Sequence, residues 1–353
     1  MRKWLIVAAV LVQVGVLGWM AAEREWVLRS GKPMFLRTAP IDPQDPMRGD
    51  YVRLTYEIAT VPKSLCRDGV TEWFSRHEDI YNSRVRDRRV YASVRLKAED
   101  LVEIVALSDR PPTEGLYLRG RAQAIHLSTL EIRFGVEALF MQQGKARQFE
   151  QTVQTEKAGV PLNVEVAVGA NGLAVIKGYR WEPLGITLTV DRDRDAARPQ
   201  GTAPVRTGIR GVTIELKNHG VTPQAVVIAE GQTLRLIPAQ ERSRTEDPSG
   251  WVWVGENSLS GKVLESAVKL LQPGESHRIH LDLTAPEWFV RKVDASGSGQ
   301  PTSLQTLVND WTASFRVEYV PPSAGDSAAL PHAELIRHVD LRSRRFGAMT
   351  GVD

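Results

Sequence analysis

The sequence has almost no cysteine: Cys66 is the single one in 353 residues. One thiol cannot form an intrachain disulfide, which excludes the class of small domains stabilised by disulfide frameworks. No cysteine directly follows the N-terminal apolar run, so a lipid-modified cysteine is excluded as an anchor. No histidine or second thiol stands near Cys66, and we interpret it as a small structural residue rather than a nucleophile.

Catalytic and metal-binding motifs are also missing. The sequence contains no Gly-x-Ser-x-Gly, Walker loop, dinucleotide fingerprint or His-Glu-x-x-His. His277 and His280 are three residues apart and would lie on opposite faces of a strand, which disfavours shared metal ligation. The aspartates of residues 191–195 alternate as in a calcium loop, but Ala196 and Thr202 stand where glycine and glutamate are required. We therefore expect neither a metal nor a cofactor.

The composition is that of an ordinary folded protein with little excess charge. Charged residues make up 25%, apolar residues 42%, and the net charge is +3. No basic run is interleaved with aromatic residues, so we expect no nucleic-acid partner. The length exceeds one typical domain and predicts two, each with its own core.

Only one long apolar run is present, at residues 4–22. As a helix it would be about 28 Å long, which matches the roughly 30 Å hydrocarbon core of a bilayer. Arg2 and Lys3 precede it, which places the N-terminus in the cytoplasm and the rest of the chain on the far side. We expect residues 1–24 to be an uncleaved signal anchor; the alternative is a cleavable signal peptide, since Ala21 and Ala22 are small.

A Pro- and Asp-rich turn at residues 41–46 precedes the most ordered pattern of the sequence. Gly49 and Asp50 suit the end of such a turn, because glycine accepts a positive φ and aspartate accepts local amide hydrogen bonds. The residues that follow alternate with a period of two, which predicts a strand with one buried face. The apolar face holds Val52, Leu54, Tyr56 and Ile58, and the outer face holds Tyr51, Arg53, Thr55 and Glu57.

Gly49-Asp50-Tyr51, followed at fixed spacing by Leu54 and Tyr56, resembles the GDYXXLXY family, which is named for this motif. A second block, residues 132–137 (Ile-Arg-Phe-Gly-Val-Glu), is similar to a later segment of that family. The chain departs from the family at residues 141–145, where a Pro-Glu-Gly step is replaced by other residues. The resemblance covers roughly residues 25–185 and implies a bacterial, membrane-anchored protein without an assigned activity. Together with the orientation given by Arg2 and Lys3, it predicts the cytoplasmic (inner) membrane as the location, with the domains on the periplasmic side.

Two functional hypotheses use these blocks. In the first, the chain is a binding module of the cell envelope, and Arg48, Asp50, Tyr51 and Arg53 contact another envelope protein or a surface polymer, because an exposed aromatic beside an arginine suits interfaces. In the alternative, Asp50 and Glu137 are the acid and base of an envelope glycan hydrolase, which requires both carboxylates in one cleft.

The alternation of the remaining chain predicts a mainly β protein. We expect a β-rich first domain at residues 25–190, a linker at 191–207, an immunoglobulin-like β-sandwich at 208–322 and a loosely held tail at 323–353. One exception is residues 263–271, whose apolar spacing predicts a helix that ends before Pro273. The arginines at positions 84, 86, 88 and 89 are interpreted as a solvated face of mixed charge.

Overall fold

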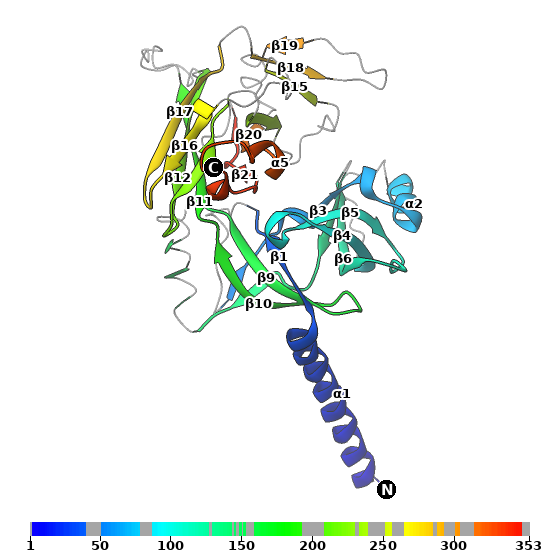
Figure 1. Ribbon diagram of the computed structural model, residues 1–353. Coiled ribbons are helices and arrows are strands. Elements are labelled where there is room, and N and C mark those ends of the chain that lie inside the picture. The colour runs from blue at the N-terminus through cyan, green and yellow to red at the C-terminus, as the bar shows by residue number, and fades with distance from the viewer. Residues whose placement is uncertain are drawn as a thin grey trace, which may run out of the picture. The chain divides into compact units, whose positions relative to one another are not determined.

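The protein is described here from a computed structural model, and it is mainly antiparallel β-structure apart from one long N-terminal helix (Figure 1). Two compact units divide the chain. Unit 1 comprises residues 1–41, 47–147 and 162–180, and unit 2 comprises residues 42–46, 148–161 and 181–353. The structure describes residues 2–39, 51–77, 87–126, 129–142, 145, 148–149, 151–152, 159–192, 208–229, 233–238, 251–255, 265–284, 288–292, 301–303 and 314–347.

Helix α1 (Arg2–Ser30) contains the apolar run. Its segment Ile6–Ser30 is long and apolar enough to cross a membrane, and none of its most apolar stretch is buried in the protein. Large side chains such as those of Trp19 and Trp26 are exposed along it. These observations support the predicted N-terminal membrane helix; they leave its orientation as a prediction.

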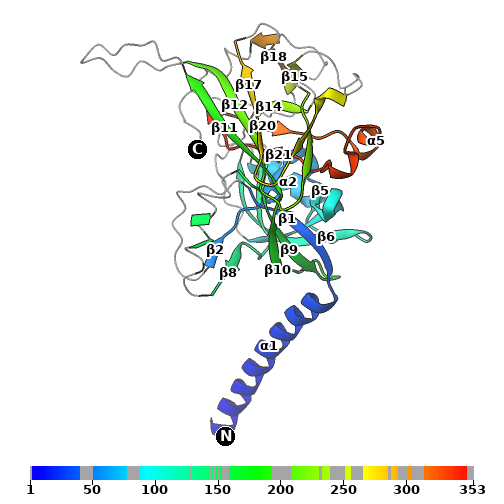
Figure 2. The ribbon, with the colours of Figure 1, turned by 60° about the vertical axis from the view of Figure 1, so that its left-hand side comes forward.

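Unit 1 contains a three-stranded sheet next to the helix (Figure 2). Strand β1 (Lys32–Arg37) pairs with β9 (Leu162–Val168), which pairs with β10 (Ala174–Trp181). The turn between β9 and β10 carries Gly172 at φ +73°, a conformation that glycine adopts without strain. The hairpin predicted at residues 169–172 is thereby confirmed.

A five-stranded antiparallel sheet forms the larger part of unit 1. Its order is β3 (Thr60–Pro62), β7 (Thr129–Arg133), β6 (Leu116–His126), β4 (Arg88–Leu96) and β5 (Val102–Ser108). Short helices join and flank these strands: η1 (Glu57–Ala59), η2 (Lys63–Leu65), α2 (Asp68–His77) and η3 (Ala98–Asp100). One face of the sheet is apolar and buried, as the alternation predicts, and the other carries charged residues.

A two-stranded ribbon of β2 (Tyr51–Arg53) and β8 (Ala138–Phe140) completes unit 1. The strand predicted to run to Ile58 is shorter than expected, because the chain turns into η1 at Glu57. Three of its four apolar positions are nevertheless buried: Val52, Leu54 and Tyr56 are each at most 2% exposed. The fourth, Ile58, lies in η1 and is half-buried. The periodicity therefore predicted burial correctly as far as Tyr56, while the predicted strand end was wrong.

Unit 2 holds the remaining strands. One sheet has the order β11 (Leu184–Arg192), β12 (Ile209–Asn218) and β17 (Ser276–Asp282). A second consists of β14 (Leu234–Pro238), β20 (Ser314–Tyr319), β21 (Leu341–Arg342) and β22 (Phe346–Gly347). Smaller sheets pair β13 (Gln224–Val227) with β16 (Val268–Leu271), and β18 (Trp288–Lys292) with β15 (Trp251–Gly255) and β19 (Pro301–Ser303). The short helices are η5 (Glu265–Ala267), α5 (Ala324–Ser327) and η6 (Ala333–Leu335).

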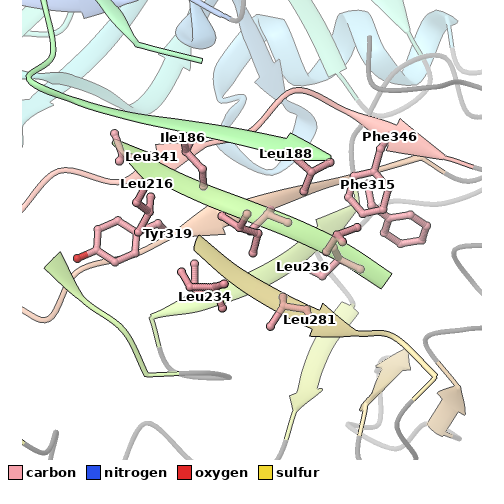
Figure 3. Close-up of a cluster of buried hydrophobic side chains, with 14 of the residues drawn as sticks. Ile186, Leu188, Leu216, Leu234, Leu236, Leu281, Phe315, Tyr319, Leu341 and Phe346 are labelled. Carbon is pink, nitrogen blue, oxygen red and sulfur yellow. The ribbon is translucent and has the colours of Figure 1, made fainter. Parts of the chain in front are cut away.

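The core of unit 2 lies between its two larger sheets (Figure 3). Ile186, Leu216 and Leu281 come from the first sheet, while Leu236 and Phe315 come from the second. Each side chain is buried, and the alternating positions that supply them are those that the sequence pattern predicts. The immunoglobulin-like subclass remains a prediction.

Three expectations about unit 2 differ from the structure. Residues 268–271 form β16 rather than a helix, because they pair with β13. The predicted tail at 323–353 is not loosely held over its described part, since Ile336, Leu341 and Phe346 are buried in unit 2. The first domain was expected to run to residue 190, but β11 pairs with β12 in unit 2. Most of the predicted linker lies outside the described residues.

Candidate functional site

Leu54 and Tyr56 of the first sequence block join that block to the second. The Tyr56 hydroxyl donates a hydrogen bond to the Val136 carbonyl at 2.6 Å, and the Leu54 amide donates to the Glu137 carbonyl at 2.8 Å. Burial, and to a lesser degree the Glu137 carboxylate, raises the pKa of Tyr56, so its hydroxyl stays a neutral donor. The two blocks therefore form one structural piece although eighty residues separate them in sequence.

The Glu137 side chain holds the turn that precedes it. Its carboxylate oxygens accept hydrogen bonds from the amides of Phe134 at 2.5 Å and Gly135 at 3.0 Å. Gly135 has φ +82°, so the turn suits glycine at this position. The sequence did not predict this role, and it gives Glu137 a structural function that explains the Gly-Val-Glu spacing.

A hollow of about 780 Å³ opens beside this turn. Phe134, Gly135 and Glu137 border it, together with strands β4, β6 and β7 and Leu173 of the β9–β10 turn. Four arginines line it: Arg89, Arg119, Arg121 and Arg133. Asp87 and Glu131 also contribute, so arginines outnumber carboxylates by four to three.

Three of these arginines form a row across neighbouring strands, which we call the arginine row. Arg89 of β4 lies directly opposite Arg121 of β6, and Arg121 lies directly opposite Arg133 of β7. Directly opposed side chains have Cβ atoms about 4.5–5.5 Å apart, and like charges in such pairs are destabilising. All three side chains are exposed on the outer face of the sheet. The row therefore places positive charges together at a cost to stability.

Partners within the described residues neutralise little of this charge. Arg121 donates to the Asp87 backbone carbonyl at 3.2 Å, which is a neutral acceptor. Arg89 and Arg133 make no side-chain hydrogen bond or ion pair with any part of the chain that the structure describes. Of the carboxylates, Glu137 is engaged by two amides and Asp87 accepts from the Gln123 amide at 3.5 Å. The chemistry available here is the binding of an anion by guanidinium groups.

A comparison with known protein families gives a match for most of unit 1. Residues 13–178 match the GDYXXLXY protein family. This segment belongs to that family. The match ends two residues before the end of unit 1 at Arg180; it leaves out residues 1–12 of unit 1 and includes residues 42–46 and 148–161, which belong to unit 2. A search of curated proteins found no match for the chain.

The predicted binding residues of the GDYXXLXY motif are only partly described. Arg53 is exposed on β2. Tyr51 occupies the same strand opposite Phe140, but its side chain is outside the description. Arg48 and Asp50 lie outside the described residues. Of the two carboxylates in the hydrolase hypothesis, the structure therefore describes Glu137 and not Asp50. Both hypotheses for these residues stay predictions.

The described residues also bear on the other sites considered from the sequence. Within the described ranges, no group of three or more histidine, cysteine, aspartate or glutamate residues could hold a metal ion. Cys66 is buried, and burial raises the pKa of its thiol to about 11, which keeps it protonated and unreactive at neutral pH. The arginine row was missed because it depends on strand register, which periodicity alone does not give.

Proposed function

We propose that this chain is a single-span, membrane-anchored binding protein of the bacterial cell envelope. In this proposal Arg2 and Lys3 keep the N-terminus in the cytoplasm, and both units lie on the periplasmic side of the inner membrane. The GDYXXLXY unit, which follows α1 directly, is the binding module. No catalytic role is assigned to either unit.

The arginine row is the observation that carries the binding role. Three like charges placed opposite one another are unfavourable in the unbound protein, and an anion that accepts hydrogen bonds from two or more of them would relieve that repulsion. Guanidinium groups suit such a ligand because they are planar, remain charged and donate in pairs. The ligand of this module is therefore an anionic component of the envelope.

A test uses the full chain in a neutral detergent and polyphosphate as a soluble anionic probe. The hollow variant Arg89→Gln/Arg121→Gln/Arg133→Gln should bind it at least tenfold more weakly than the wild type. A matched control, Arg110→Gln/Lys217→Gln/Lys269→Gln, removes the same charge outside the hollow and should bind as the wild type does. Equal affinity of the two variants would contradict a specific role of the hollow.

The exposed Arg53, with Arg48, Asp50 and Tyr51, is proposed as a second contact surface of the same module. It would bind another envelope protein or a surface polymer, because an arginine beside aromatic residues is typical of interfaces. A photo-crosslinking amino acid at position 53 should give a discrete adduct in native membranes. The same label at the exposed Val221 in unit 2 serves as the control. Identical adduct patterns at the two positions would show that Arg53 is not part of a specific contact surface.

A further inference from the structure

We infer that the anion bound by the arginine row is the head-group phosphate of anionic phospholipid in the membrane that α1 crosses. This inference rests on the proposed function and names the ligand of its site. It follows from the position of the hollow relative to the anchor, which are both parts of unit 1.

The turn between β9 and β10 borders the hollow and contacts α1. Figures 1 and 2 show this hairpin next to the end of the helix. On one side, Leu173 borders the hollow and the Arg119 amide donates to the Gly172 carbonyl at 2.8 Å. On the other side, the Asn171 side-chain amide donates to the Glu23 carboxylate at 2.8 Å. The same short turn therefore contacts both the floor of the hollow and the helix.

The contact on α1 lies where the helix leaves the hydrocarbon. Glu23 is the first residue after the apolar run of residues 4–22. Val27, one turn further, is 4% exposed and lies against Gly169, whereas Trp26 is 72% exposed. Exposed tryptophan at the end of a membrane helix is typical of the head-group region. The β9–β10 turn is thus at the level of the lipid head groups.

The arginine row is a short distance from that turn. Arg121 is two residues beyond Arg119, whose amide contacts the turn, and two residues of a strand span about 7 Å. Neighbouring strands are about 4.8 Å apart, so Arg89 and Arg133 flank Arg121 within the reach of one extended side chain. The head-group region on each side of a bilayer is itself roughly 5–8 Å thick. The row is therefore within reach of phosphate groups.

Proximity favours lipid over a soluble polymer as the ligand. Because the anchor holds the hollow beside the membrane, head groups are present at a high effective concentration, and even weak individual contacts are occupied. The bound state would hold the GDYXXLXY unit against the membrane.

The experiment measures binding of dioctanoyl-phosphatidylglycerol to the full chain in neutral detergent, by native mass spectrometry and by thermophoresis. Dioctanoyl-phosphatidylcholine, inorganic phosphate and polyphosphate are the comparison ligands. The wild type and the control variant Arg110→Gln/Lys217→Gln/Lys269→Gln should retain phosphatidylglycerol in preference to phosphatidylcholine. The hollow variant Arg89→Gln/Arg121→Gln/Arg133→Gln should bind phosphatidylglycerol at least tenfold more weakly.

The outcomes separate this inference from the proposed function. If the hollow variant loses polyphosphate but binds phosphatidylglycerol as the wild type does, the hollow binds anions and the lipid inference is wrong. If inorganic phosphate competes fully with the lipid at equal concentration, the site recognises free phosphate and the lipid inference is again wrong. Unchanged binding of both polyphosphate and lipid would overturn both. Thermal unfolding of the hollow variant at or above the wild-type temperature shows that lost binding is not lost folding.

Discussion

The outer faces of two antiparallel sheets, one in each unit, handle charge in opposite ways. On β12 and β17 of unit 2, Glu215 lies opposite Arg278 and accepts hydrogen bonds from the Ser276 hydroxyl at 2.7 Å and from Arg278 at 3.3 Å. The Ser276 hydrogen bond is the main influence that lowers the pKa of Glu215. On β4, β6 and β7 of unit 1, arginine lies opposite arginine. Glu215 and Arg278 therefore neutralise each other, as Arg95 and Glu103 do on β4 and β5 of unit 1, whereas the directly opposite residues within the arginine row are all arginines.

The comparison holds only for the outer faces, because the inner faces of both sheets carry buried apolar side chains. Leu118 in unit 1 and Leu216 in unit 2 are each 0% exposed. Leu118→Ala and Leu216→Ala should each lower the free energy of unfolding by about 2–5 kcal/mol through lost apolar burial and a residual cavity. Urea unfolding followed by circular dichroism measures this. Val221→Ala, at a side chain 92% exposed, should change little; a loss below 1 kcal/mol at either leucine would contradict the described cores.

A buried tyrosine in unit 2 should make stability depend on alkaline pH. Burial raises the pKa of Tyr319 from 10.0 to about 12. Because the folded pKa is above the unfolded value, the stabilisation is complete below about pH 10 and is lost as the pH rises to about 12. That difference corresponds to about 3 kcal/mol. Between pH 9 and pH 11.5, the free energy of unfolding should fall less in Tyr319→Phe than in the wild type. Equal falls would show that Tyr319 ionises as freely in the folded protein as in the unfolded chain.

The corresponding tyrosine of unit 1 tests the link between the two sequence blocks. Tyr56→Phe removes the donor to the buried Val136 carbonyl and should cost about 1–3 kcal/mol. Tyr91→Phe is the control, because the Tyr91 hydroxyl has no hydrogen bond to the described part of the chain and its ring contact with Tyr117 is retained. Thermal and urea unfolding measure both variants. A cost at Tyr56 no larger than that at Tyr91 would mean that this hydrogen bond does not join the blocks.

The smallest expected effects compare the two outer faces directly. Arg278→Gln in unit 2 removes a favourable cross-strand pair and should lower stability by about 0.2–1 kcal/mol. Arg121→Gln in unit 1 removes like-charge repulsion and should leave stability unchanged or raise it by a similar amount. Salt should diminish both differences. If Arg121→Gln destabilises the protein as much as Arg278→Gln, the row is not under electrostatic strain.

Much of the fold could be predicted from the sequence, because alternation reports burial. The apolar stripes at residues 90–96, 130–136 and 162–168 are strands or strand ends with buried side chains, and the hairpin turn near Asn171 has the expected chemistry. The helix predicted at residues 263–271 was wrong at residues 268–271, because a short apolar run fits either a helix or a strand. Pairing between β16 and β13 decides it, and that pairing involves residues more than forty positions away.

The site was less predictable, because it depends on register and on turns. Arg88 and Arg89 stood in a cluster interpreted as one solvated face, yet alternation sends them to different environments. The Arg88 guanidinium lies 4.7 Å from the Trp73 ring centroid, while Arg89 enters the row opposite Arg121. Glu137 was considered as a catalytic carboxylate, but only the folded turn shows both its oxygens accepting amide hydrogen bonds. The positions of these side chains depend on contacts between segments that are distant in sequence, and local sequence patterns do not reveal such contacts.

The order of strands also bears on how the chain folds during synthesis. Every described strand of unit 1 ends at or before Trp181, so that unit has these pairing partners when half the polypeptide is made. In unit 2, β14 can pair only after β20 has been synthesised. Strand β20 in turn pairs with β21 and β22, and β22 ends at Gly347. This sheet of unit 2 is therefore completed only when the last part of the chain has been synthesised. A ribosome stalled before residue 341 should hold a protease-resistant first half and a protease-sensitive second half.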